Sequence, residues 1–99
     1  MEDRIAWLHT IADALEAEAE TIAQLESLDT GKPIALARRV DAARSVANFR
    51  FFAEYAAQQP QQTFEDHGAI NYVHRSPVGV VGLITPWNLP LYLLSLIHI

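Results

Sequence analysis

The stretch from Val78 to Pro90 decides the fold and reads VGVVGLITPWNLP. Its first seven residues are glycine or apolar, most of the apolar ones are β-branched, and none is charged. This composition is typical of a strand buried on both faces in the centre of a parallel sheet. Pro86 and Pro90 lack a backbone N–H, so strand pairing is expected to end there. Asn88 would then lie just beyond the carboxyl end of a buried strand, where open α/β sheets place ligand-binding groups.

Asn88 and the two prolines around it have two interpretations. In the structural one, Asn88 caps the helix that follows. In the functional one, the side-chain amide is held between two ring-locked residues in order to bind or react, since the prolines cost secondary structure without an obvious packing return. The residue types alone leave both interpretations open.

Two glycine-containing segments could suggest a phosphate site, but neither has the required spacing. Gly79 and Gly82 lie inside the predicted strand and not after it, which favours close backbone packing over a nucleotide loop. Gly31-Lys32 lacks the upstream glycine and the following Ser or Thr of a P-loop. We interpret it as the end of a helix.

Composition restricts the class of protein. The 99 residues are 51% hydrophobic, enough for one small core, and the net charge of −5 argues against a nucleic-acid partner. The chain has no cysteine, which excludes a disulfide, a zinc–thiolate site or a cysteine nucleophile within these residues. Its four histidines lack metal-ligand spacing, so no metal site is predicted. No secretory signal is recognisable, and a cytoplasmic location is expected.

The last part of the chain is unusually apolar. From Ser76 to the end there is no Asp, Glu, Lys or Arg, and only His98 could ionise. A membrane helix is disfavoured because glycines and prolines interrupt the segment. A buried strand of a larger domain fits better, so we expect the chain to be part of a longer protein.

The first sixty residues predict helices. Apolar residues at three–four spacing indicate either one helix kinked near residues 17–19 or two helices meeting there. Gly31 suits a left-handed residue that ends this part, and Pro33 can open the next helix, expected over residues 34–58. A polar connector and a strand over residues 69–74 should follow.

Two side-chain patterns on the helix over residues 34–58 carry predictions. Its arginines are expected to form a solvated face balanced by Asp41 and Glu54. Its aromatic residues are interpreted as core rather than as a binding site, and they are Phe49, Phe51, Phe52 and Tyr55.

Taken together, these motifs resemble the amino-terminal fifth of the aldehyde dehydrogenase superfamily. The resemblance rests on LESLDTGKP at residues 25–33, on the helix from Asp41 to Ala53, and on SPVGVVGLITPWNLPLYLL at residues 76–94. Within the family, residues 70–72 and 88–94 look most like the muconate-semialdehyde dehydrogenases, which act on 2-aminomuconic or 2-hydroxymuconic semialdehyde.

The resemblance implies an incomplete α/β fold. Residues 1–58 would be helices of a Rossmann-type NAD-binding domain, and residues 59–77 a connector and a strand reaching toward the oligomerisation domain. Residues 78–93 would be the first buried strand and the Pro-Trp-Asn turn. The match ends after Leu94, and residues 94–99 read like a translated sequencing adapter, so we expect this tail to be non-native.

The resemblance also implies an activity for the whole enzyme, the NAD-dependent oxidation of an aldehyde to an acid through a cysteine thiohemiacetal, with NADP as the alternative cofactor. Asn88 matches the asparagine that donates to the oxyanion. The positions that line the cofactor are matched by Ile84, Thr85, Pro86 and Trp87. The enzyme would be a homodimer or homotetramer that acts on a small-molecule aldehyde.

The family's nucleophilic cysteine and its glutamate base lie outside this chain, so the chain alone is expected to be inactive. The alternative is a small non-catalytic interaction module whose apolar C-terminal segment docks on a partner.

Overall fold

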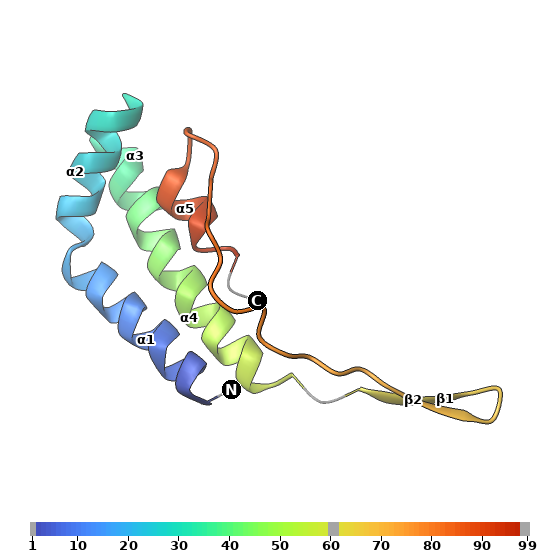
Figure 1. Cartoon of the computed structure of the whole chain (residues 1–99). Helices are drawn as coiled ribbons and strands as arrows, with labels where there is room; N and C mark the ends of the chain where they lie inside the picture. The colour runs from blue at the N-terminus through green and yellow to red at the C-terminus, as the bar shows by residue number, and fades with distance from the viewer. Residues whose placement is uncertain (1, 60–61, 98–99) are drawn as a thin grey trace.

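The computed structural model describes residues 2–59 and 62–97 and shows an elongated helical body with a projecting hairpin (Figure 1). The described part measures 58 × 24 × 23 Å. Its elements, in chain order, are helices α1 (Glu2–Ala17), α2 (Ala19–Thr30) and α3 (Ile34–Leu36), the π-helical segment η1 (Ala37–Ala42), helix α4 (Ala43–Ala57), strands β1 (Thr63–Asp66) and β2 (Ala69–Tyr72), and helix α5 (Pro90–Leu94). In the described residues, no helix is long and apolar enough to cross a membrane.

The helical body is a hairpin of helices, with α1 running alongside α4 and α2 alongside η1 (Figure 1). The buried residues of the α1–α4 contact include a large side chain, Phe49, whereas those of the α2–η1 contact are all alanines. The first cluster consists of Ala12, Val46 and Phe49 with Leu8, Leu15 and Leu94 packed against it, and the second of Ala23, Ala37 and Ala42 with Ala19, Ile22 and Ile34.

The predicted helix boundaries are confirmed. Helices α1 and α2 meet at Glu18, inside the expected interval. Gly31 ends α2 with φ = 74°, and its N–H donates to the carbonyl of Ser27 at 3.0 Å. Glycine adopts this left-handed conformation without steric cost. Pro33 directly precedes α3, as expected.

The predicted long helix is continuous from Ile34 to Ala57, with η1 forming a wider turn within it. One face of it is buried at every fourth position, namely Ala37, Asp41, Ser45, Phe49 and Ala53. The expectation that all four aromatic residues belong to the core is half wrong. Phe49 and Phe52 are buried, whereas Phe51 and Tyr55 are exposed and stack on each other with ring centroids 6.0 Å apart.

The predicted strand over residues 69–74 is present as β2, over Ala69–Tyr72, and it pairs antiparallel with β1, which the sequence did not predict. His67 and Gly68 connect them with φ values of 49° and 77°, and two left-handed residues are what a type I′ hairpin turn requires. The hairpin projects away from the helices (Figure 1). Pro60 and Gln61 of the predicted connector lie outside the described residues.

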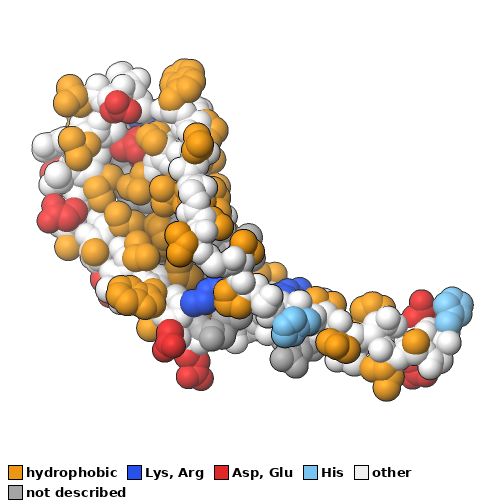
Figure 2. Space-filling view, in the orientation of Figure 1, with side chains coloured by type: hydrophobic (Ala, Val, Ile, Leu, Met, Phe, Trp, Pro, Cys, Tyr) orange, Lys and Arg blue, Asp and Glu red, His pale blue; other side chains and the backbone are white. Residues whose placement is uncertain are grey.

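The buried strand predicted from Val78 onward is wrong for this structure. Residues 78–84 form no strand, and Val80 and Ile84 are almost fully exposed. The physical reason is that a central strand needs neighbours on both edges, and the strands that the structure describes, β1 and β2, pair with each other. Figure 2 shows apolar side chains along this segment and over the helical body. The described fold is therefore helical with a two-stranded sheet, and the expected Rossmann sheet is not confirmed.

The C-terminal segment packs on α4. Ser95, just after α5, is fully buried, and the side-chain amide of Asn48 donates to its hydroxyl at 2.9 Å. His98 and Ile99 of the suspected tail lie outside the described residues. The non-native origin of residues 94–99 stays a prediction.

Candidate functional site

The turn that carries Asn88 is closed by its own hydrogen bond. The Thr85 hydroxyl donates to the Pro90 carbonyl at 3.1 Å, across the bend that contains Trp87 and Asn88. Pro90 is the first residue of α5, where its missing N–H costs no hydrogen bond and its fixed φ suits a helix. The two prolines therefore set the shape of the turn locally.

The side chains of this turn face solvent. Asn88 is exposed, Trp87 is 83% exposed and Ile84 is 98% exposed. The interpretation of Asn88 as a helix cap is wrong, because Leu89 is the N-cap residue of α5 and the Leu91 N–H in its first turn donates to Glu26. The amide of Asn88 is exposed on a turn that contains two prolines, and its functional interpretation stays a prediction.

Lys32 connects the helical body to this turn. Its ammonium group lies 2.9 Å from Oδ1 of Asp41 and donates to the Asn88 carbonyl at 3.0 Å. It also lies 3.7 Å from Oε2 of Glu26. The other carboxylate oxygen of Glu26 accepts the Leu91 N–H at 3.1 Å. The turn is thus held on both sides of Pro90 by one group of charged residues.

This charged cluster is buried, and the sequence analysis missed it. The side chains of Lys32, Glu26 and Asp41 are 13%, 6% and 1% exposed. The expectation that Asp41 balances the arginines at the surface is wrong. The missed signal was spacing, since Asp41 lies four residues from Ala37 and from Ser45 on the buried face of its helix.

Two of the arginines, Arg38 and Arg50, instead pair with acidic residues of α1 and α2. Arg50 donates to Oε2 of Glu16 at 2.6 Å and to Oδ1 of Asp13 at 2.9 Å. Arg38 donates two hydrogen bonds to Glu20, at 2.6 and 2.8 Å. Together with a weaker contribution from Gln24, these bonds lower the pKa of Glu20 from 4.5 to about 2. Bonding to Arg50 likewise lowers the pKa of Glu16.

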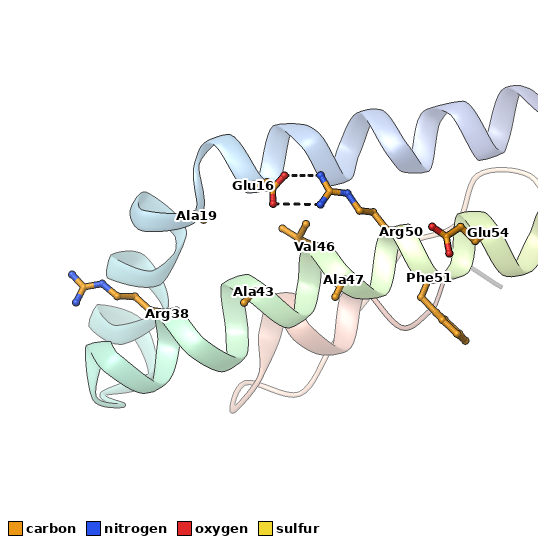
Figure 3. Close-up of a pocket in the computed structure, with 9 residues that line it drawn as sticks. All are labelled: Glu16, Ala19, Arg38, Ala43, Val46, Ala47, Arg50, Phe51 and Glu54. Carbon is orange, nitrogen blue, oxygen red and sulfur yellow. Dashed lines mark hydrogen bonds and ion pairs between the residues drawn. The ribbon is translucent and has the colours of Figure 1, made fainter.

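A cleft of about 520 Å³ lies beside these ion pairs, between α4 and the junction of α1 with α2 (Figure 3). Val46, Ala47 and Phe51 contribute apolar lining, and Figure 3 shows Glu16 and Arg50 joined across it. Glu16 and Arg50 neutralise each other there, and none of the predicted site residues lines the cleft. The cleft is therefore separate from the candidate site.

The Glu20–Arg38 pair predicts a pH dependence. Because the folded-state pKa of Glu20 lies below its ordinary value, the pair stabilises the fold above about pH 4.5 and loses this effect as the pH falls toward about 2. We expect Glu20→Gln to lower the urea midpoint of the chain near neutral pH and to have a much smaller effect near pH 2. Circular dichroism at both pH values measures this. Glu18→Gln is the control, because the described residues offer Glu18 no ion pair, and an equal loss for Glu20→Gln at both pH values would contradict the prediction.

Comparison with known proteins assigns the fold to a family. Residues 1–97 match the model of the aldehyde dehydrogenase family. The chain belongs to this family. The resemblance to aldehyde dehydrogenases inferred from the sequence is therefore confirmed. We call this chain the dehydrogenase segment, and its residues 84–88 lie within the matched part.

The similar proteins include dehydrogenases of muconic semialdehydes. Human 2-aminomuconic semialdehyde dehydrogenase is 52% identical over 96 residues, which cover 95% of this chain and 20% of that protein. The 2-hydroxymuconic semialdehyde dehydrogenase of Pseudomonas sp. (strain CF600) is 42% identical over 100 residues, covering 96% of the chain and 21% of that protein. The dehydrogenase segment thus spans about a fifth of the length of these relatives.

A solved structure has the same fold. It is a crystal structure of a Burkholderia cenocepacia protein described as a candidate aldehyde dehydrogenase, with a TM-score of 0.79 and 48% sequence identity. The similarity covers 94% of this chain and 19% of that one. The helical body with its hairpin is therefore a partial aldehyde dehydrogenase fold.

Proposed function

We propose that this dehydrogenase segment serves an enzyme that oxidises a muconate-type semialdehyde to a carboxylic acid. The observation that carries the proposal is the similarity to 2-aminomuconic and 2-hydroxymuconic semialdehyde dehydrogenases along 95% and 96% of the chain. Asn88 is the residue of this segment to which we assign a role in the reaction.

Asn88 would act on the negative charge that develops on the aldehyde oxygen when a nucleophile adds to the carbonyl carbon. A neutral amide N–H stabilises such an oxyanion without itself gaining or losing a proton. Two features support this role. The side chain of Asn88 is exposed, and its backbone carbonyl is held by Lys32. A donor held in place before the reaction needs little reorganisation during it.

The turn also has surfaces that fit a nicotinamide cofactor. Ile84, Trp87 and Pro86 expose apolar groups next to Asn88, whereas the Thr85 hydroxyl is occupied by its bond to Pro90. We propose that Ile84, Pro86 and Trp87 would pack against NAD or NADP and that Thr85 would hold their backbone in shape. When bound, the nicotinamide ring supplies a hydride acceptor.

The interaction-module alternative loses its main support. This alternative was based on the apolar C-terminal segment, which could dock on a partner and is exposed at Val78 and Val80. The same segment belongs to the part matched by the family model, so an enzyme explains it without a separate docking partner. The homodimer or homotetramer and the cytoplasmic location stay predictions.

The activity can be tested with a complete dehydrogenase polypeptide that carries this segment. We expect aldehyde-dependent reduction of NAD or NADP with 2-hydroxymuconic semialdehyde. Its kcat/KM should exceed that for hexanal by about tenfold or more, because an enzyme that binds the carboxylate of a muconic semialdehyde would leave the groups that bind it unpaired with hexanal. Reduction of either cofactor is followed by absorbance. Equal kcat/KM values would contradict the substrate assignment, and no turnover of either aldehyde would contradict the activity.

A further inference from the structure

The buried cluster of Lys32, Glu26 and Asp41 holds the turn by its backbone. Lys32 binds the Asn88 carbonyl at 3.0 Å, and Glu26 accepts the Leu91 N–H at 3.1 Å. Pro90, between these two attachment points, has no N–H of its own. The cluster therefore fixes the main chain on either side of the proline and leaves the side chain of Asn88 exposed.

The three residues of the cluster come from three separate parts of the helical body. Glu26 comes from α2, Lys32 from the loop after it, and Asp41 from η1. The Lys32 carbonyl accepts the Ser27 hydroxyl at 2.7 Å, so the backbone that carries the ammonium group is also tethered. These contacts tie the turn to the helical body where α2, its following loop and η1 meet.

Stability alone does not explain this cluster. Two carboxylates and one ammonium are withdrawn from water, and Oδ2 of Asp41 has no hydrogen-bond partner among the described residues. Desolvation of buried charges offsets much of their attraction, and apolar replacements of similar volume are often as stable or more stable. The charged groups form directional hydrogen bonds to the backbone of the turn, which an apolar cluster could not form.

We propose that Lys32, supported by Glu26 and Asp41, is a positioning residue that aims Asn88 at the reacting oxygen. This inference rests on the proposed role of Asn88. Lys32 touches the backbone of Asn88 and not its amide, so it acts on the reaction through Asn88. Misplacement of a reacting group by about 1 Å can cost about a hundredfold in rate.

The test is a double-mutant cycle in the complete dehydrogenase. Lys32→Met is expected to lower kcat about 10- to 100-fold with a smaller loss of cofactor affinity, and Lys32→Arg is expected to restore part of the loss because it keeps the charge. In an Asn88→Ala background, Lys32→Met should have little further effect, because the donor it positions is already gone. Arg39→Met is the control, being exposed and outside every ion pair that the structure describes.

Lys32→Met leaves two buried carboxylates without their cation and can prevent folding. The second variant is therefore Lys32→Met with Asp41→Asn, which removes one charge of each sign. Circular dichroism and cofactor binding identify the folded variants. The positioning role would be overturned if the losses in kcat for Lys32→Met and Asn88→Ala multiplied in the variant that carries both. A normal kcat in a folded variant with Lys32→Met and Asp41→Asn would also overturn it. Normal kcat for Asn88→Ala alone would instead overturn the proposed function, so the two failures are distinguishable.

Discussion

Replacement of Asn88 by Ala in the complete dehydrogenase is expected to lower kcat by about 100- to 1000-fold, the usual cost of losing one oxyanion donor. The loss should fall on kcat, because the amide acts on charge that develops only after the nucleophile adds to the aldehyde. The side chain is exposed and caps no helix, so the fold should be retained. Steady-state kinetics, with cofactor affinity measured separately, gives the result.

Asn88→Asp is the matched variant, because it keeps the size of the side chain and replaces the donor with an acceptor. A carboxylate would repel the oxyanion, so this variant should be at least as slow as Asn88→Ala. Leu89→Ala, next to Asn88 in the same turn, is the control. A kcat near the unmodified value for both Asn88 variants would remove the assignment.

Replacement of Phe49 by Ala is expected to have the largest effect on folding. Phe49 is 2% exposed and joins α4 to α1 through Ala12, with Leu94 of α5 packed on the same cluster. Truncation of a buried Phe costs about 3–5 kcal/mol, a large part of the stability of a small domain. Urea unfolding of the 99-residue chain, followed by helical circular dichroism, should show a much lower midpoint or no cooperative transition.

Phe51→Ala provides the comparison, because Phe51 is 58% exposed and contacts mainly Phe52 and Tyr55. Its loss should cost about 1 kcal/mol, the range of an aromatic pair at the surface. Equal midpoints for the two variants would mean that the α1–α4 core is not where the structure places it.

Features coded by neighbouring residues could be predicted from the sequence. The α1–α2 junction, the Gly31 cap and the long helix all follow from local spacing and from conformations that single residues permit. The number of aromatic residues could not predict that Phe49 is buried whereas Phe51 is exposed. It depends on which helix face meets α1, and the buried positions four residues apart determine that face.

The strand prediction failed for a different reason. A β-branched apolar run has the intrinsic preference for a strand, but pairing depends on neighbours that are distant in sequence. Residues 78–84 have no neighbouring strand among the described residues, and all of them except the half-buried Leu83 are exposed. Strand β1 was missed because Thr63–Asp66 is short and mostly polar, and its sequence carries little strand signal. Its pairing register with β2 is set by the His67-Gly68 turn.

The candidate site was found in part. Its predicted residues, Ile84 to Asn88, stand out because prolines and an amide interrupt an apolar run. The cluster that holds them was missed, because Lys32 is 56 residues from Asn88 and the pairing is visible only in the fold. Local signals thus located the turn, and the fold supplied its anchor.

Single-turnover kinetics tests the role of Asn88 most directly, because it isolates the steps in which the oxyanion forms and collapses. Unmodified enzyme and Asn88→Ala, each saturated with cofactor, would be mixed with 2-hydroxymuconic semialdehyde while cofactor reduction is followed. We predict a first-turnover rate about 100- to 1000-fold lower for the variant. An unchanged first-turnover rate would contradict the assignment of Asn88 to the oxyanion.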